Sequence, residues 1–292
     1  MSDVQETVVK AQDPKLFYSE PDIGDMLDSG SFGEVFLVKR LSDQMQFALK
    51  VSKRAERREQ QELIREAALM ISINDDSVLG CIDAYEWENR VWLFLPFMDT
   101  GKLTDICINR LKFRMNLLTE ESCKYLAFRI CRGIRALHMR NILHRDIKSD
   151  NVFISRDGDV KLADLGFSVF LSEEFQQRDT QCGTISWLAP EIINGEYYAK
   201  SVDIWALGVT IYELATGLPP FLERDRNLLK MKIVSEPIPR IASSYSEEFQ
   251  DFIDRCLERR VEHRWDINRL LQHDFLQGAD AFQSNWVREL GQ

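Results

Sequence analysis

The segment from His144 to Asn151, which reads HRDIKSDN, constrains the fold of this chain more than any other part of it. It places an acid, a cation and an amide close together, at Asp146, Lys148 and Asn151, and short apolar runs bound it on both sides. The apolar residues would anchor this segment on both sides, so the polar groups are predicted to lie on a turn that is fixed at both ends. A polar turn without a function is the alternative, but it does not explain this anchoring.

Strand patterns dominate the first third of the chain. Between residues 23 and 52 the apolar residues alternate or form short β-rich blocks, separated by the turn signals DSGSFG and LSDQ, which predicts three consecutive strands. A helix is expected at about 55–73, where apolar residues recur at helical spacing. Two more strands are expected at about 79–87 and 91–96. The pattern therefore predicts a small, mostly antiparallel sheet that carries one helix.

The rest of the chain is predicted to be mainly helical. Long amphipathic patterns cover residues 119–139, 201–216 and 246–258. Residues 1–17 are polar and aperiodic, as is expected of a tail. The predicted divisions are an N-terminal tail at 1–17, a small lobe at 18–97, a larger lobe at 98–277 and a C-terminal tail at 278–292.

Four further motifs accompany HRDIKSDN in a defined order. The glycine-rich turn DSGSFG precedes FALK at 47–50, in which an apolar strand carries a lysine that is costly to bury without anionic partners. DLG at 164–166 follows a predicted strand, and APE at 189–191 closes the segment after it. Dinucleotide-binding proteins also use a glycine-rich turn, but within a parallel βαβ unit, whereas Gly30 and Gly33 lie between consecutive predicted strands.

Together these motifs resemble those of the eukaryotic protein kinases, and HRDIKSDN is closest to the PAK-type branch of the sterile-twenty-like serine/threonine kinases. The resemblance covers about residues 18–277. It implies an α+β, bilobal protein kinase fold, with a small antiparallel β-sheet lobe that carries one helix and a larger, mainly α-helical lobe. It also implies transfer of the γ-phosphoryl group of ATP to serine or threonine hydroxyls of proteins, with Mg²⁺ as the metal. The expected partners are ATP, protein substrates and a regulatory protein.

The resemblance implies a role for each polar residue of the catalytic loop. Asp146 would accept the proton of the attacking hydroxyl, and Lys148 would face the charge on the transferred phosphoryl group. Asn151 and Asp164 would hold Mg²⁺, for which oxygen ligands are suited.

Lys50 is expected to hold the ATP phosphates and to pair with a helix glutamate. Glu66 is the better match, because the segment REAALM resembles the family and its spacing from Lys50 is right, and Glu62 one turn earlier is the alternative. The residues expected to contact the nucleotide are Leu27, Gly30, Ser31, Phe32, Gly33, Val35, Ala48, Lys50, Leu95, Pro96, Phe97, Met98 and Phe153.

Two residues depart from the family pattern. Asp28 replaces the first glycine of the glycine-rich loop, which puts the affinity for ATP in doubt, and Leu165 replaces a phenylalanine, which changes packing but not charge. These departures support the alternative, a pseudokinase that acts as a scaffold or an allosteric partner. Because the expected base and metal ligands are all present, we favour an active enzyme.

The resemblance also indicates regulation and substrate choice. Thr180 lies four residues before Thr184, a spacing that resembles the PAK-type activation-loop phosphosite, and Arg145 would receive the phosphate. Asp150 and Glu213 resemble positions that bind arginine in kinases with basic substrates.

Two further roles are structural. Arg264 matches an arginine that pairs with Glu191 in the family, and Asp203 matches an aspartate that braces the catalytic loop through its backbone.

The composition limits location and partners. A net charge of -10 argues against nucleic acid as the main ligand and is compatible with basic substrates. The 6 cysteines show no metal-binding spacing, which suits reduced thiols in a cytoplasmic or nuclear protein. The start of the sequence lacks the order of a signal peptide, and the most apolar run, at 91–98, is too short to span a bilayer, so no membrane span is expected.

Overall fold

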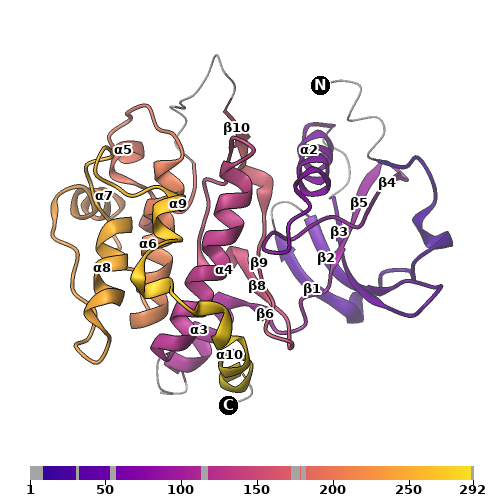
Figure 1. Ribbon diagram of the computed structural model, residues 1–292. Helices are drawn as coiled ribbons and strands as arrows, with labels where there is room; N and C mark the ends of the chain where they lie inside the picture. Colours follow the sequence, from indigo (N-terminus) through magenta and orange to yellow (C-terminus); the bar gives the residue numbers. More distant parts are fainter. Residues whose placement is uncertain are drawn as a thin grey trace. The chain divides into compact units, whose positions relative to one another are not determined.

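The computed structural model describes residues 9–30, 33–52, 57–112, 118–171, 178 and 182–290. The chain divides into two compact units, one formed by Met1–Asp99 with Asp164–Gly166 and the other by Thr100–Ala163 with Phe167–Gln292. The first unit contains a five-stranded sheet and a long helix, and the second is mainly helical (Figure 1). The predicted α+β architecture is thereby confirmed.

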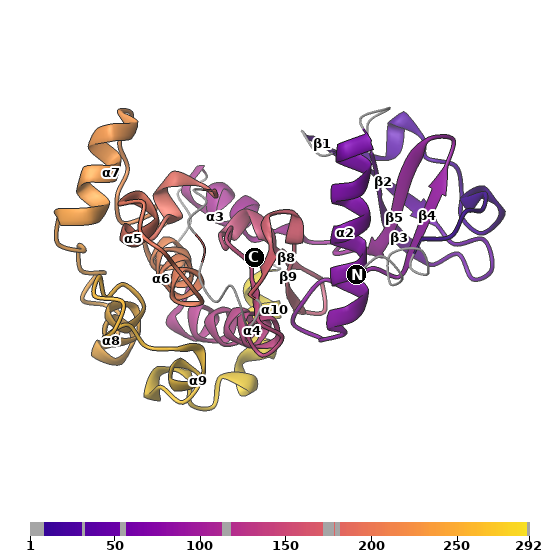
Figure 2. The same ribbon diagram turned by 90° about the horizontal axis from the view of Figure 1, so that it is seen from above.

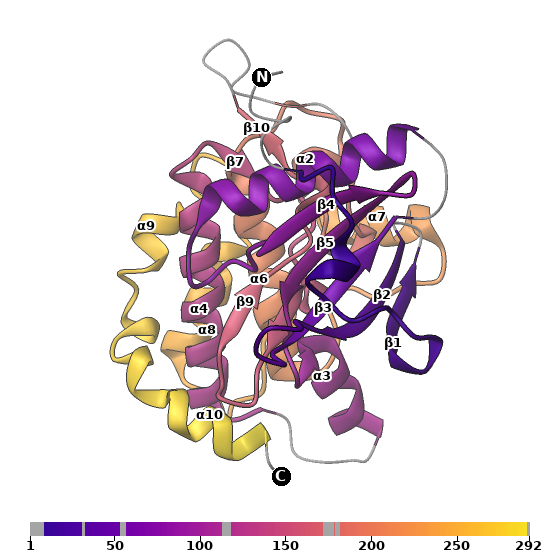
Figure 3. The same ribbon diagram turned by 90° about the vertical axis from the view of Figure 1, so that its right-hand side faces the viewer.

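The sheet of the first unit is antiparallel throughout, in the order β1-β2-β3-β5-β4. The long helix α2 lies against β5 on one face of the sheet (Figure 3). The elements are β1 (Met26–Gly30), β2 (Gly33–Lys39), β3 (Gln46–Val51), α2 (Arg57–Ile73), β4 (Asp83–Trp87) and β5 (Arg90–Pro96).

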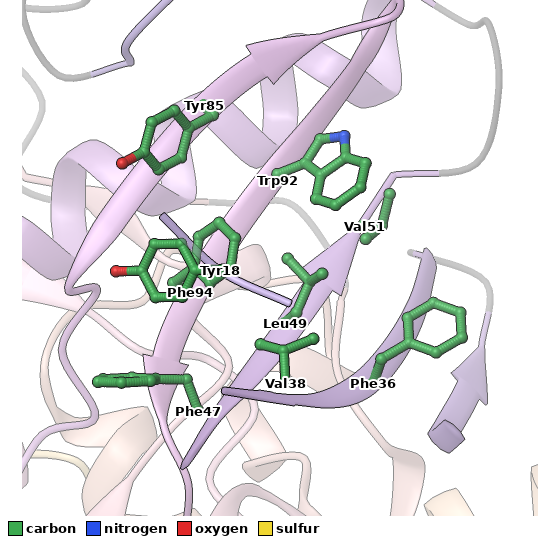
Figure 4. Close-up of a cluster of buried hydrophobic side chains, with 9 residues drawn as sticks. All are labelled: Tyr18, Phe36, Val38, Phe47, Leu49, Val51, Tyr85, Trp92 and Phe94. Atoms are coloured by element: carbon green, nitrogen blue, oxygen red, sulfur yellow. The ribbon is translucent and has the colours of Figure 1, made fainter. Parts of the chain in front are cut away.

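The face of the sheet opposite Lys50 carries an aromatic core. Alternation along β3 buries Phe47, Leu49 and Val51 on this face and leaves Ala48 and Lys50 on the other. The ring of Tyr18 stacks on that of Phe94, with centroids 3.7 Å apart. The cluster, drawn in Figure 4, consists of Tyr18, Phe36, Val38, Phe47, Leu49, Val51, Tyr85, Trp92 and Phe94.

The segment at 9–17, which we expected to be part of a tail, is attached to the edge of this sheet. The Lys10 backbone N–H donates to the Ala84 carbonyl at 2.9 Å. Two side chains, the Lys10 ammonium and the Tyr18 hydroxyl, donate to the Asp83 carboxylate, each at 2.5 Å. The polar sequence of this segment gave no sign of the attachment. Hydrogen bonds between backbone groups and the edge strand β4 hold the segment, and such bonds leave no hydrophobic periodicity.

The second unit is built around two buried helices, α4 and α6, which lie side by side (Figures 1 and 2). The Thr119 hydroxyl caps the start of α4, and Gly217 ends α6 with a positive φ of 82°. The helices are α3 (Leu103–Lys112), α4 (Glu120–His138), α5 (Pro190–Ile193), α6 (Ser201–Thr216), α7 (Arg226–Ser235), α8 (Glu247–Cys256), α9 (Ile267–Leu270) and α10 (Gln283–Leu290). Among the described residues, no helix is long and apolar enough to cross a membrane.

Short strands connect these helices. They are β6 (Gly101–Lys102), β7 (Ile142–Leu143), β8 (Val152–Ile154), β9 (Val160–Leu162) and β10 (Val169–Phe170), which form the sheets β6-β8-β9 and β10-β7. The expected polar turn therefore lies between two short buried strands, β7 and β8.

The C-terminal segment is not the simple tail that we expected. Helix α10 packs on α4 and buries Trp286 completely. The Glu289 carboxylate accepts hydrogen bonds from the Thr119 backbone N–H at 3.2 Å and the Thr119 hydroxyl at 2.8 Å. The lone tryptophan in a short polar stretch was too weak a signal to predict a packed helix.

Candidate active site

The turn between β7 and β8 gathers three predicted side chains around one carboxylate. Asp146 is buried, with an exposed fraction of 4%. The Lys148 ammonium lies 2.8 Å from Asp146 Oδ2, and Asn151 Nδ2 donates to the Asp146 carbonyl oxygen at 2.7 Å and to Oδ2 at 3.0 Å. The carboxylate is thus held by a cation and an amide in one rigid orientation.

Thr184 completes this arrangement from a distant part of the chain. Its backbone N–H and its hydroxyl donate to Asp146 Oδ1 at 3.2 and 3.1 Å, and its hydroxyl accepts from Lys148 Nζ at 2.8 Å. In the sequence, Thr184 served as the reference point for the spacing of Thr180. The structure places it in direct contact with the predicted base.

Asp203, on the buried helix α6, holds the backbone of the same turn. Its Oδ1 accepts from the Arg145 N–H at 2.9 Å, and its Oδ2 lies 2.9 Å from the His144 backbone nitrogen and 2.8 Å from His138 Nε2. Burial alone would raise the pKa of Asp203, but the hydrogen bond from His138 and its charge, with the Arg145 N–H, lower it below the usual value. The predicted bracing role is confirmed.

Backbone conformations in this region are unusual. Arg145 and Asp164 are not glycines but have positive φ angles of 69° and 63°, which cost energy unless their surroundings hold them. Gly183 has a φ of 102°, and a Cβ atom there would lie 2.7 Å from the Arg145 carbonyl oxygen. Position 183 therefore requires glycine, since any side chain would push the segment away from Arg145.

In the first unit, the Lys50 ammonium lies 2.8 and 3.0 Å from the two carboxylate oxygens of Glu66. Strand β3 provides the lysine and helix α2 provides the glutamate, the residue that we favoured over Glu62. Burial lowers the pKa of Lys50, but the Glu66 and Asp164 carboxylates outweigh it and raise this pKa above its usual value. Lys50 therefore carries a stable positive charge.

Two predicted metal ligands offer oxygen atoms of the required kind. The Asn151 amide nitrogen donates to Asp146, so the atom of this side chain that could bind a metal is Oδ1. The Asp164 carboxylate accepts one N–H, from Gly166 at 3.3 Å, and its charge acts on Lys50. No cluster of three or more His, Cys, Asp or Glu residues suited to a metal occurs in the described part of the chain. Carboxylate and amide oxygens are the kind of ligand that Mg²⁺ accepts, and this ion takes few protein ligands together with substrate phosphates.

The glycine-rich turn is described only in part. Gly30 pairs with Gly33 across it, and a Cβ atom at Gly33 would lie 2.3 Å from the Val51 carbonyl oxygen, so this position also requires glycine. Ser31 and Phe32 lie outside the described residues. The Asp28 carboxylate, which replaces the first family glycine, accepts the Ser29 N–H at 2.8 Å.

Most of the other predicted nucleotide contacts lie on strands of the first unit or directly after β5, and one lies in the second unit. Val35 is opposite Lys50 in the sheet, and Ala48 is opposite Leu95. Pro96 ends β5, Phe97 and Met98 follow it, and Leu27 on β1 is 46% exposed. Phe153 lies on β8 of the second unit.

Of the two predicted regulatory residues, the structure describes Arg145. Thr180 lies outside the described residues. The Arg145 guanidinium donates from Nε to the Phe167 carbonyl oxygen at 2.7 Å and from Nη1 to the Tyr198 hydroxyl at 3.2 Å. Tyr198 was missed, because nothing in its sequence context indicates a contact with Arg145.

The two acids that we expected to bind arginine of a substrate are Asp150 and Glu213, and the charge of the first acts on the second. Glu213 on α6 is buried, and its burial raises its pKa to about 7, with a further rise from the Asp150 charge. A buried carboxylate beside a second acid would gain from a cationic partner.

Comparison with known proteins agrees with this arrangement. The protein kinase domain family matches residues 22–276. The serine/threonine-protein kinase pakB of Dictyostelium discoideum is 32% identical over 274 residues, which cover 93% of this chain and 32% of that protein. The corresponding kinase pakA of the same organism is 34% identical over 275 residues, covering 93% of this chain and 22% of that protein. Serine/threonine-protein kinase pak-1 of Caenorhabditis elegans is 30% identical over 280 residues, covering 95% of this chain and 47% of that protein.

The chain thus spans from about a fifth to about a half of the length of these relatives. Their names confirm the resemblance to PAK-type kinases that the motifs predicted.

Proposed function

The chain belongs to the protein kinase family, and we propose that it transfers the γ-phosphoryl group of Mg-ATP to serine or threonine hydroxyls of proteins. The observation that carries this proposal is the contact set of Asp146, in which a carboxylate, the Lys148 ammonium and the Thr184 hydroxyl meet within hydrogen-bond distance. Phosphoryl transfer needs little covalent chemistry from the protein, so positioned charges are the main requirement.

The described side chains supply these charges. Asp146 would accept the proton of the substrate hydroxyl, while Lys148 would offset the negative charge on the transferred group. Lys50, held by Glu66, would bind the ATP phosphates. Asn151 and Asp164 would hold Mg²⁺, which would supply charge neutralisation at the phosphate oxygens.

The alternative, a pseudokinase scaffold, draws less support from the two departures than the sequence suggested. The Asp28 carboxylate is engaged with its neighbour's N–H. Leu165 is 1% exposed, so it occupies an apolar position as a phenylalanine would. Both departures are compatible with catalysis.

We also propose three finer properties. Basic protein substrates suit the acidic pair Asp150 and Glu213.

Phosphorylation of Thr180, with Arg145 as the receiving cation, would activate the enzyme in signalling. A regulatory protein would also act on the enzyme. All 6 cysteines are free, which suits a cytoplasmic or nuclear location with reduced thiols.

A direct assay tests the proposal. Purified protein is incubated with labelled Mg-ATP and a peptide array, beside the Asp164→Asn variant. We expect label on serine or threonine of basic peptides with the wild type and none with the variant. Label on neither, while the wild type is still stabilised thermally by ATP, would favour the pseudokinase alternative.

The phosphosite needs its own experiment. Intact mass and peptide mapping after incubation with Mg-ATP are compared between the wild type and Thr180→Ala. Phosphate at Thr180, with lower activity in the alanine variant, supports the proposed switch. An unmodified Thr180 with full activity in the variant would remove it.

A further inference from the structure

Arg145 connects two parts of the second unit that lie far apart in sequence. Its Nε donates to the carbonyl oxygen of Phe167, directly after the DLG motif, at 2.7 Å. Its Nη1 donates to the hydroxyl of Tyr198, which follows the APE motif and α5, at 3.2 Å. One guanidinium group thereby contacts residues on both sides of the segment that separates these motifs.

Tyr198 is buried and is held by hydrogen bonds of its backbone and its side chain. It is 2% exposed, and its backbone exchanges two hydrogen bonds with that of Arg178, each 2.8 Å long. The guanidinium of Arg178 in turn donates to the Phe170 carbonyl oxygen. Burial raises the pKa of the Tyr198 hydroxyl above its usual value, and the neighbouring Cys182 side chain acts on this pKa.

The residues after Cys182 lead directly to the predicted base. Gly183 packs against the Arg145 carbonyl oxygen so closely that no Cβ fits. Thr184 then donates both its N–H and its hydroxyl to Asp146. Because Gly183 packs directly on Arg145, a group that holds Arg145 also holds Thr184 in its position on Asp146.

The hydrogen bond to Tyr198 also leaves the Arg145 guanidinium able to bind a further group. Among the described residues, Nη2 of Arg145 makes no hydrogen bond, whereas Nε and Nη1 are engaged. A guanidinium has enough donors to hold a hydroxyl and a phosphate oxygen at once. The Tyr198 hydroxyl and a phosphate are therefore compatible partners of the same cation.

We propose that Tyr198 is a positioning residue whose hydroxyl holds Arg145 and the 182–184 run in the active arrangement before any phosphate is present. The enzyme then has a basal activity that depends on Tyr198, and phosphorylation strengthens an arrangement that already exists. This inference rests on the proposed kinase function. Tyr198, which lies outside the catalytic loop, would thus perform part of the anchoring of Arg145 that a phosphate would otherwise perform.

The test compares Tyr198→Phe with Tyr197→Phe, which removes the same hydroxyl from a neighbouring side chain that is 70% exposed. Both variants are prepared in the wild type and in Thr180→Ala, and the latter proteins are treated with a phosphatase. For each protein, kcat, the KM for ATP and the KM for a peptide are measured, together with the melting temperature. The phenylalanine ring preserves the packing, so both variants should remain folded.

In the phosphate-free proteins, we expect Tyr198→Phe to lower kcat about tenfold, equivalent to about 1.4 kcal/mol, with the KM for ATP unchanged. Tyr197→Phe should have no effect. When Thr180 is phosphorylated, the effect of Tyr198→Phe should fall below about twofold, because the phosphate then anchors Arg145.

Three results would overturn the inference. The first is an equal loss of kcat in both phosphorylation states, which would mean a general packing role. The second is full basal activity in phosphate-free Tyr198→Phe. The third is a phosphate-free Thr180→Ala protein with Tyr198 intact that has no activity while the phosphorylated wild type is active. If neither form transfers phosphate, the proposed function itself fails.

Discussion

The Arg264 guanidinium makes two parallel hydrogen bonds to the Glu191 carboxylate, 2.7 and 3.0 Å long. Their side chains are 0% and 3% exposed, so both charges are removed from water. The predicted pairing is confirmed, and it ties α5, at the end of the APE motif, to the segment between α8 and α9.

Breaking this pair from one side should be costly. Arg264→Leu would leave the Glu191 carboxylate buried without its cation, and we expect a loss of about 3–5 kcal/mol in the free energy of unfolding, measured by urea denaturation. The double variant Arg264→Leu/Glu191→Leu should lose less than the single one, because no charge is left unpaired. A single variant as stable as the wild type would mean that the pair contributes nothing.

The chemistry depends on three charges. Lys50→Met, Asp146→Asn and Asp164→Ala should each remove detectable phosphotransfer, because each removes a charge that the nucleotide, the nucleophile or the metal needs. Circular dichroism should show that all three remain folded. Transfer at the wild-type rate by Asp164→Ala would contradict the metal assignment.

The departure in the glycine-rich turn predicts a change in binding. Asp28→Gly should lower the KM for ATP several-fold, because it removes a carboxylate from a loop that is proposed to cover phosphates, and it should leave kcat nearly unchanged. Steady-state kinetics at varied ATP measures both. An unchanged KM would show that the bond between Asp28 and the Ser29 N–H keeps the charge away from the nucleotide.

Glu213 should make stability depend on pH. Its pKa in the folded chain is about 7, whereas the usual value for a glutamate is 4.5, so the folded state binds its proton more tightly than the unfolded state. The free energy of unfolding should therefore decrease as the pH rises from about 4.5 to about 7, by at most about 3 kcal/mol from this group. Glu213→Gln should flatten this part of the stability profile. An identical slope in wild type and variant would exclude a raised pKa.

Contiguous motifs could be predicted from sequence, whereas contacts between distant positions could not. Asp146, Lys148 and Asn151 lie within one turn, so their spacing alone brings them together. Tyr198 contacts Arg145 across 53 positions, and no periodic pattern reports such a contact.

The additions at the two ends were missed for different reasons. Lys10 attaches through backbone groups and a salt bridge to Asp83, which hydrophobic patterns do not reveal. Helix α10 is held by the buried ring of Trp286 and by the Glu289 carboxylate, in a segment too short for a reliable helical period.

The attachment of the catalytic turn to Asp203 has a consequence for how this turn exchanges hydrogen with solvent. The amides of His144 and Arg145 belong to a loop, and loop amides usually exchange within seconds to minutes. Here both donate to a carboxylate on a helix whose aspartate is completely buried. Their deuterium uptake should therefore be as slow as that of α6 itself, because these amides are released only when the surrounding core opens.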